Sequence, residues 1–209
     1  MEPATIVVVN GPPGAGKTAL AARLRERHGW TVLAKDTIKE ALFDTLGMRD
    51  RDWSRSLSDA SFELVFRLAE QAIGRARVVV LEGNFRGEHF PRVMRLAATR
   101  GAKVLEVTLA ASGDVLEQRL RERAAAASRH PGHRDAELVD KLRQPGALAS
   151  AAPACGTANA FPPETRRLEF DTRLLDDAML DRIAAHVAAT VGESGCGIFA
   201  PPMAGSTPE

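Results

Sequence analysis

Apolar residues follow two different patterns along this chain, and each pattern predicts a different type of secondary structure. Runs in which consecutive residues are apolar occur at 5–10 (TIVVVN) and 77–83 (RVVVLEG). Such runs are typical of strands that are buried on both faces of a parallel sheet. The segments 30–36 (WTVLAKD), 103–110 (KVLEVTLA) and 166–172 (RRLEFDT) predict three further strands.

Apolar residues that recur three or four positions apart predict helices between these strands. The expected helices span residues 16–28, 36–47, 58–74, 89–100, 114–128 and 176–191, with a shorter one at 137–143. In the second of them, we expect Ile38, Ala41 and Leu42 to face inward. Strand and helix alternate, which predicts right-handed crossovers and an α/β fold, with a parallel sheet of about five strands sandwiched by helices.

The domain is expected to occupy residues 1–191. A chain of 209 residues, of which 44% are hydrophobic, can bury one sizeable core. Within it, residues 114–143 are expected to form a helical lid, and residues 144–164, which have few large apolar side chains, predict a variable functional loop. Residues 192–209 are rich in Gly, Pro and Ser and predict a disordered tail.

The loop GPPGAGKT, from Gly11 to Thr18, fits the pattern G-x-x-x-x-G-K-[ST] between a predicted strand and a predicted helix. In this context, the loop backbone and the positive end of the helix surround the phosphates of a nucleotide. Lys17 would reach the β- and γ-phosphates, and the Thr18 hydroxyl would bind Mg²⁺. The predicted nucleotide-binding residues of the loop are Gly11, Pro13, Gly14, Ala15, Gly16, Lys17 and Thr18. We therefore expect a P-loop NTPase fold that binds ATP and Mg²⁺.

Two absent motifs narrow the class of nucleotide-binding protein. A GTPase would carry N-K-x-D after a later strand, and the sequence has no such segment. A ring-forming ATPase usually has a helical second domain and a D-E pair at the end of a strand, whereas the comparable strand here ends in LEGN at 81–84. These absences favour a small kinase.

Lys35 and Asp36 end the second predicted strand, so they are expected beside the phosphate loop. The Asp36 carboxylate could accept a proton from an acceptor hydroxyl as the hydroxyl attacks the γ-phosphoryl group. Alternatively, Asp36 caps the helix that follows it, and the two roles are compatible. We assign Lys35 to the substrate side of the site.

The end of the strand at 77–83 and the residues after it also predict site chemistry. Glu82 would face Mg²⁺ or its water ligands, although simple solvation at a strand end is an alternative. Asn84 and Arg86 are expected on a loop that faces the substrate, where Arg86 could orient an anionic or polyhydroxylated acceptor. An exposed surface role is an equal alternative for Arg86.

Arginines in the predicted helix at 114–128 have a spacing that favours a role in phosphoryl transfer. Arg119 and Arg123 are four residues apart and share a helical face, whereas Arg121 points elsewhere and can pair with Glu117. Guanidinium groups on a lid would stabilise the negative charge that spreads over the γ-phosphate oxygens. The alternative is a solvated helix face.

The segment SRHPGHRD at 128–135 breaks that helix at a Pro-Gly pair. Arg129, His130 and His133 are expected in a turn that gates the substrate, with Arg129 and His133 contacting it. Zinc is a weaker alternative because no Cys, Asp or Glu cluster completes a site.

Composition limits the partners of the protein. The net charge is +1, aromatic residues make up 5% of the chain, and there is no tyrosine, so we do not expect nucleic acid as a partner. The apolar runs are shorter than a membrane span, and the N-terminus has no signal-peptide pattern, so we expect a cytoplasmic protein that is a monomer or a homodimer.

Five segments together resemble small P-loop kinases that are grouped with AAA-domain ATPases. The segments are NGPPGAGKT, LAKDTIKEALFDTLG, VVLEGNFR, LEQRLRERAAAASRHPGHRD and LEFDT. These kinases are similar in fold to chloramphenicol phosphotransferase, zeta toxin, and gluconate and shikimate kinases. The resemblance covers about residues 5–191 and implies a phosphate-loop kinase, but it does not specify an acceptor.

The resemblance also implies roles for single residues. Asp36 matches the acceptor-side general base, Arg119 matches an arginine that stacks on adenine, and Arg123 matches one that clamps phosphate. Asp171 and Thr172 match the turn that lines the adenine pocket. The chain departs from the pattern because Asp36 is followed by Thr37 where shikimate-type kinases have D-x-D, and because Glu82 stands where many relatives have Asp.

The sequence thus predicts an ATP- and Mg²⁺-dependent kinase that phosphorylates a hydroxyl of a small molecule such as a sugar, nucleoside or antibiotic. A polynucleotide 5′-kinase is an alternative, but it would need a basic groove with stacking aromatic residues. A nucleotide-dependent switch or binding module, in which hydrolysis changes only the shape of the protein, is the other alternative.

Overall fold

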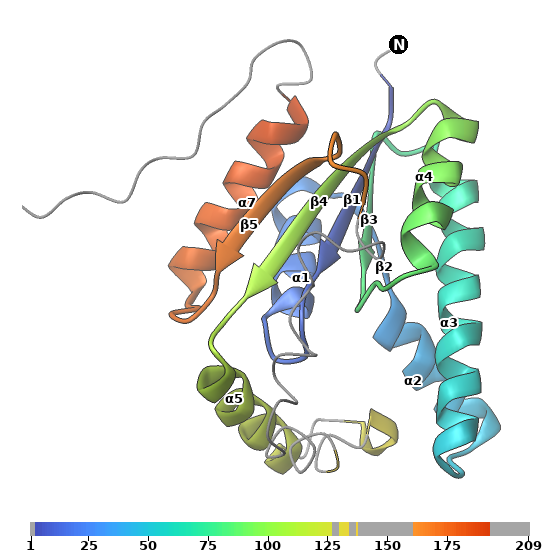
Figure 1. Cartoon of the computed structure of the whole chain (residues 1–209), viewed down its shortest axis with the longest axis vertical. Helices are drawn as coiled ribbons and strands as arrows, with labels where there is room; N and C mark the ends of the chain where they lie inside the picture. The colour runs from blue at the N-terminus through green and yellow to red at the C-terminus, as the bar shows by residue number, and fades with distance from the viewer. Residues whose placement is uncertain (1–2, 127–129, 134–136, 138–160, 193–209) are drawn as a thin grey trace, which may run out of the picture.

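The strands of the computed structural model run parallel in one sheet, in the order β2-β3-β1-β4-β5 (Figure 1). The structure describes residues 3–126, 130–133, 137 and 161–192. The strands are β1 (Thr5–Asn10), β2 (Thr31–Ala34), β3 (Val78–Glu82), β4 (Lys103–Ala110) and β5 (Arg166–Asp171). The helical segments are α1 (Lys17–His28), α2 (Lys35–Leu46), α3 (Arg51–Ala72), α4 (His89–Arg100), α5 (Gly113–Ala125), η1 (Pro131–His133) and α7 (Asp177–Gly192). The expected α/β fold with a parallel sheet is confirmed.

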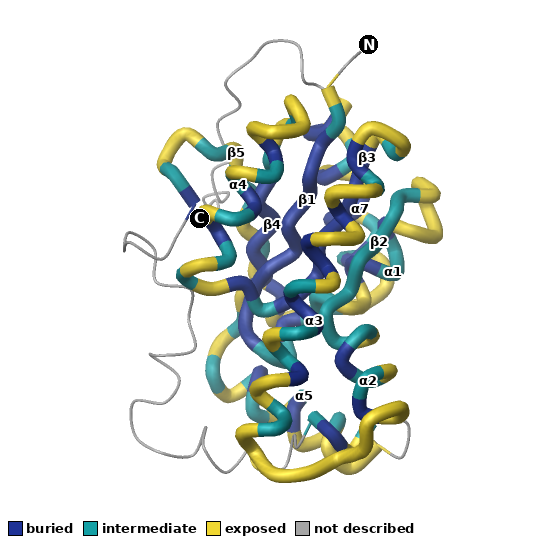
Figure 2. Tube along the Cα trace, turned by 90° about the vertical axis from the view of Figure 1, so that its right-hand side faces the viewer, coloured by how far each residue is buried: buried dark blue, intermediate teal, exposed yellow. Residues whose placement is uncertain are grey.

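Alternate residues of the central strand pack into two separate cores. Val7 and Val9 of β1 contact the core beneath α1 and α7, whereas Ile6 and Val8 contact the core beneath α3 and α4. Figure 1 shows these helix pairs on opposite faces of the sheet, and Figure 2 shows that β1, β3 and most of β4 are buried, whereas the edge strand β2 is only partly buried. All six residues of β1 are buried, which explains its unbroken β-branched apolar sequence. The central strand therefore has little freedom to move, and its carboxyl end is a fixed point.

Helices α2 and α5 lie beyond the carboxyl ends of the strands (Figure 1). Helix α2 begins directly after β2, so its N-cap is Ala34, which makes no side-chain cap. The alternative that Asp36 caps this helix is therefore wrong, because Asp36 already lies in the first turn. A carboxylate in a first turn is favoured by the positive end of the helix.

The inward face of α2 differs from the expected one. Its buried residues are Lys39 and Phe43, while Ala41 is exposed and Ile38 and Leu42 are partly buried. The difference arises because α2 packs against α3 at the end of the sheet rather than on a sheet face. The spacing of apolar residues can show that a helix has a buried face, but it could not show which neighbouring element packs against α2.

Helix α3 starts earlier than the apolar pattern predicted. It begins at Arg51, and the side chain of Asp50 caps it by accepting a hydrogen bond from the backbone N–H of Trp53 at 2.8 Å. The early start adds turns in which Ser54 contacts Lys39 of α2 and Arg55 faces the space between the two helices.

Lys39 is an ionisable residue in the interface between α2 and α3. Its residue exposure is 8%, and its ammonium donates a hydrogen bond to the Ser54 hydroxyl at 3.0 Å. The pKa of Lys39 is lowered to about 8, chiefly because burial disfavours the charged form. Repulsion from Lys35 lowers this pKa further, and attraction to Asp36 and Asp59 offsets part of the shift.

Replacing Lys39 with methionine should stabilise the fold by about 1 kcal/mol at pH 7, after allowance for solvent screening of the charge. Between pH 8 and pH 10.5 the unfolded lysine binds a proton that the folded lysine lacks, so the wild type gains stability as the pH rises. The advantage of Lys39→Met should therefore shrink across that window. Urea unfolding at several pH values measures it, and a Lys39→Met variant that is less stable than the wild type at pH 7 would contradict this account.

Candidate functional site

The phosphate loop connects β1 to α1 and is held against several elements. Gly11, Gly14 and Gly16 all have positive φ, and Gly16 is the N-cap of α1. At Gly14 a Cβ atom would strain the backbone and lie 3.3 Å from the Leu116 carbonyl oxygen of α5. Ala15 is fully buried, and its backbone N–H donates to the Pro12 carbonyl at 3.2 Å. The loop is therefore fixed by the sheet on one side and by α5 on the other.

Lys17 lies at the first position of α1 and reaches back over the loop. Its ammonium donates hydrogen bonds to the carbonyl oxygens of Gly11 and Pro12, both at 2.9 Å. Burial lowers the pKa of Lys17, and the nearby carboxylates of Glu82 and Asp36 partly oppose the shift. The phosphate loop, Glu82 and Asp36 thus share one electrostatic environment.

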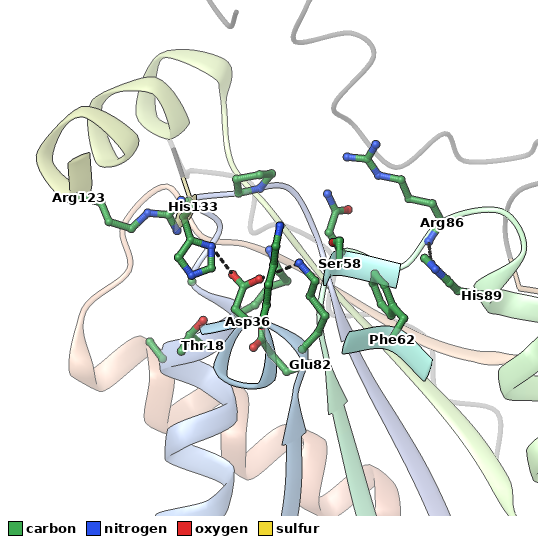
Figure 3. Close-up of a pocket in the computed structure, with 18 of the residues that line it drawn as sticks. Thr18, Asp36, Ser58, Phe62, Glu82, Arg86, His89, Arg123 and His133 are labelled. Carbon is green, nitrogen blue, oxygen red and sulfur yellow. Dashed lines mark hydrogen bonds and ion pairs between the residues drawn. The ribbon is translucent and has the colours of Figure 1, made fainter. Parts of the chain in front are cut away.

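A cavity of about 710 Å³ opens where the loop, α2, α3, α5, η1 and the end of β3 meet (Figure 3). It brings together most of the site residues that the sequence predicted. Those that line it are Pro13, Gly14, Gly16, Lys17, Thr18, Lys35, Asp36, Glu82, Asn84, Arg86, Arg119, Arg123 and His133. Gly11, Ala15, Asp171 and Thr172 do not line it.

Asp36 lies near the middle of the cavity in the view of Figure 3. Thr18 and Arg123 are on one side of it, and Ser58, Phe62, His89 and Arg86 are on the other. The cavity therefore has a half at the phosphate loop and a second half between α3 and the loop that follows β3. We call the second half the α3 subsite; it is lined by Lys39, Arg55, Ser58, Asp59, Phe62, Asn84, Arg86 and His89.

The Asp36 carboxylate is held by two cationic or ionisable side chains. Its Oδ1 is 3.1 Å from the Lys35 ammonium, and its Oδ2 is 3.9 Å from Nδ1 of His133. The other ring nitrogen of His133 is 2.6 Å from Oε1 of Glu40, one turn further along α2. These contacts position a half-buried carboxylate beside the phosphate loop.

Glu82 ends β3 and is 2% exposed, in register beside Val9 of β1. Its carboxylate and the Thr18 hydroxyl are oxygen donors in the wall of one cavity, close to the Lys17 ammonium. Hard oxygen donors of this kind suit Mg²⁺, which takes few protein ligands and completes its shell with water and phosphate oxygens. No group of three or more His, Cys, Asp or Glu side chains that could hold a metal occurs among the described residues. The donor set of Glu82 and Thr18 therefore fits magnesium bound together with a nucleotide.

The η1 turn docks onto α2 through charged and aromatic contacts. His130 lies 3.0 Å from Oδ1 of Asp44, and its ring stacks on Phe43 with centroids 5.6 Å apart. Gly132 approaches the same ring so closely that an added Cβ would lie 2.4 Å from it. Together with the contact between His133 and Glu40, these interactions explain how the HPGH segment closes one side of the cavity.

The arginines of α5 lie on different sides of the helix, as their spacing in the sequence predicted. Arg119 and Arg123 line the cavity, whereas Arg121 forms an ion pair with Glu117 away from it. Arg119 donates to the carbonyl oxygens of Gly14 at 3.3 Å and Thr172 at 2.6 Å, so its guanidinium bridges the phosphate loop and the end of β5.

Thr172 and Asp171 support this region rather than facing the cavity. The buried Thr172 hydroxyl is 3.0 Å from the carbonyl oxygens of both Ala15 and Ala110. The Asp171 carboxylate accepts hydrogen bonds from the backbone and side chain of Arg173. Both residues thus fix the turn beside Arg119.

Sequence reasoning did not predict the residues that α3 contributes. Phe62 belongs to the core, yet it also lines the cavity and stacks on His89 with ring centroids 3.9 Å apart. Burial lowers the pKa of His89, which favours its neutral form. Because Nδ1 accepts the Arg86 backbone N–H at 3.0 Å, we assign the ring proton to Nε2. The cap at Asp50 was the sequence signal that could have extended α3 toward the site.

Some predicted features lie outside the described residues. They are Arg129, nearly all of the helix expected at 137–143, residues 144–160 of the expected variable loop, and residues 193–209 of the expected tail. Within the described part of the chain, no helix is long and apolar enough to cross a membrane.

Comparisons with known proteins agree with this geometry. The model of the AAA domain family AAA_33 matches residues 6–145. An uncharacterised protein of Mycobacterium tuberculosis, Rv2004c, is 30% identical over 132 residues, which cover 59% of this chain and only 26% of that protein. The match therefore spans about a quarter of the length of this curated relative.

Solved structures show the same fold. A protein of Chloroflexus aurantiacus that has been proposed to be a kinase has a TM-score of 0.73 and 27% identity, with coverage of 90% of this chain and 98% of that chain. The APS kinase CysC of Mycobacterium tuberculosis, solved with AMPPNP and APS, has a TM-score of 0.54 and 17% identity, with coverage of 92% and 100%. This chain belongs to the AAA_33 family of AAA domains and has the P-loop fold of these kinases.

Proposed function

We propose that this protein is an ATP- and Mg²⁺-dependent phosphotransferase that moves the γ-phosphoryl group to a hydroxyl of a small molecule, such as a sugar, nucleoside or antibiotic. The observation that carries the proposal is the cavity in which Asp36 lies between the phosphate loop and the α3 subsite. A nucleotide switch has no need of a carboxylate and a second binding space beside the γ-phosphate. The kinase descriptions of the structural neighbours support the same reaction class.

Residues of the loop and of α5 would bind the nucleotide. The Lys17 ammonium is desolvated at the start of α1, where the positive helix end also favours phosphate. Arg123 lies close enough to Lys17 for charge repulsion to lower the pKa of Lys17, and both residues line the cavity. A γ-phosphate bound between them would be neutralised from two sides. Arg119, which donates to the Thr172 carbonyl, would contact the base.

Thr18 and Glu82 would hold Mg²⁺. When bound, the metal would neutralise charge on the β- and γ-phosphate oxygens. The buried Glu82 carboxylate also attracts the Lys17 ammonium, and this attraction opposes the lowering of the Lys17 pKa by burial.

Asp36 would act as the general base for the acceptor. As the acceptor oxygen forms a bond to the γ-phosphorus, its proton passes to the Asp36 carboxylate. The bond between the γ-phosphorus and the β,γ-bridging oxygen breaks, and ADP leaves with that electron pair. Lys35 and His133 hold the carboxylate in place during this step.

Asp36→Asn should lower phosphoryl transfer by about 10²- to 10⁴-fold because the amide cannot accept the proton. Nucleotide affinity should change little, since Asp36 lies beyond the phosphate loop. ADP formation and mass spectrometry of the product, across hydroxylated metabolites, nucleosides and antibiotics, measure the transfer.

Glu63→Gln is the matched control for this carboxylate, because Glu63 pairs with Arg67 and Arg92 away from the cavity. It should transfer phosphate like the wild type. Equal ATP hydrolysis by the wild type and Asp36→Asn, without any phosphorylated product, would instead support a nucleotide switch.

Arg123→Met should lower kcat by about 10³-fold or more, as expected when a cation that stabilises the transferring phosphoryl group is removed. Arg121→Met is the control on the same helix, and its kcat should stay within about twofold because an exposed ion pair contributes little. Steady-state kinetics of both variants tests the assignment. Similar losses of kcat in the two variants would show that the substitutions disturb the structure of α5 and that Arg123 has no specific role at the γ-phosphate.

A further inference from the structure

Cationic side chains outnumber acidic ones around the α3 subsite. Lys39, Arg55 and Arg86 line the subsite and Lys35 lines the adjoining part of the cavity, whereas the acidic residues are Asp59 in the subsite and the proposed base Asp36 beside Lys35. Arg55 is paired with Asp52 at 2.8 Å and Lys35 with Asp36 at 3.1 Å. Neither Lys39 nor Arg86 has an ion pair within 4 Å among the described residues. The net excess of positive charge is therefore local to this half of the cavity, because the whole chain carries only +1.

Lys39 is the most deeply placed of these cations. Its polar contact is the neutral Ser54 hydroxyl at 3.0 Å, and its ammonium lies 5.2 Å from the centre of the Phe43 ring. Lys35 is one helical turn away on the same side of α2, and its side chain is 12% exposed. Two ammonium groups thus lie on one wall of the cavity, where repulsion from Lys35 lowers the pKa of Lys39 and the carboxylates of Asp36 and Asp59 oppose that effect.

This arrangement costs stability, so a structural role for Lys39 is a poor explanation. A buried ammonium without a carboxylate partner is disfavoured, and an apolar side chain of similar length would pack there at less cost. The chain also prefers arginine, since only five of its 28 basic residues are lysine. Three of those five, Lys17, Lys35 and Lys39, line this cavity. Compact ammonium groups therefore gather where a ligand can bind.

The opposite wall of the subsite has a different character. Phe62 and His89 form a stacked pair, and the neutral His89 ring directs no charge to the ligand. The Ser58 hydroxyl and the Asn84 amide add neutral hydrogen-bonding groups. One wall thus suits an oxyanion, and the other suits the hydroxyls and carbon skeleton of a small molecule.

We infer that the phosphoryl acceptor is a small hydroxylated anion whose carboxylate, phosphate or sulfate group binds Lys39 and Lys35 while its hydroxyl faces Asp36. Lys35 contacts Asp36 directly, so the anionic group and the reacting hydroxyl of the acceptor are separated by only a few bonds. Arg86 and Arg55 border the same subsite and attract the anion toward it. This inference rests on the proposed phosphotransferase function and adds the chemical class of its acceptor.

Sulfate tests the anion site without knowledge of the acceptor. The full chain is first saturated with Mg²⁺ and AMPPNP, so that the phosphate loop and the γ-phosphate position are filled, and sulfate is then titrated by calorimetry. We expect one saturable site with a Kd on the order of 1 mM. Lys39→Met should weaken it about tenfold or more, and Lys39→Arg should retain it.

Lys103→Met is the matched control, because Lys103 is exposed at the start of β4, at the opposite end of the sheet. It should bind sulfate like the wild type. Absence of saturable sulfate binding, or binding that persists in Lys39→Met, would overturn the inference. If AMPPNP itself fails to bind, the proposed function fails first and the inference falls with it.

Matched acceptors provide the second arm of the test. Glycerate and glycerol, or gluconate and glucitol, differ mainly in a carboxylate, and ADP formation with each pair compares anionic with neutral acceptors. Any transfer should favour the anionic member, and Lys39→Met should raise its KM about tenfold with a smaller change in kcat. A preference for the neutral members, unchanged in Lys39→Met, would contradict the assignment, and the sulfate titration decides the matter if no pair reacts.

Discussion

The rest of the site depends on the burial of the Lys17 ammonium in the phosphate loop, which begins where the fully buried strand β1 ends. The burial of β1 between two cores fixes the point at which the chain turns into the phosphate loop. At that point the loop is enclosed by α5, the end of β5 and the carboxylates of Glu82 and Asp36. Burial lowers the pKa of Lys17, and in such an environment the charge interaction between an ammonium and a bound phosphate is stronger than in bulk water.

The direct passage of β2 into α2 explains why phosphate and acceptor chemistry meet in one cavity. Because no loop separates the two elements, Lys35, Asp36 and Lys39 follow the edge of the sheet within a short stretch of chain. Helix α3 supplies the opposite wall, and η1 covers α2 through the pairs His133 with Glu40 and His130 with Asp44. Positive charge that destabilises the interface between α2 and α3 is thereby placed where an anionic acceptor can offset it.

The sequence was most informative where local pattern and structure depend on the same residues. The consecutive valines of β1, the glycines of the loop and the spacing of Arg119 and Arg123 predicted the sheet, the phosphate loop and the two arginines that face the cavity. The buried face of α2 could not be predicted in this way, because packing against α3 and η1 decides it, and Lys39 was therefore missed. The early start of α3 was missed because apolar periodicity, rather than the cap at Asp50, set the expected boundary.

A crystal structure of the chain with AMPPNP and Mg²⁺ tests the central claim most directly. The account predicts the triphosphate inside the loop 11–18, with Mg²⁺ near Thr18 and Glu82, Lys17 and Arg123 at the γ-phosphate, and the γ-phosphorus facing Asp36. A nucleotide bound elsewhere, or a γ-phosphate separated from Asp36 by packed side chains, would contradict it.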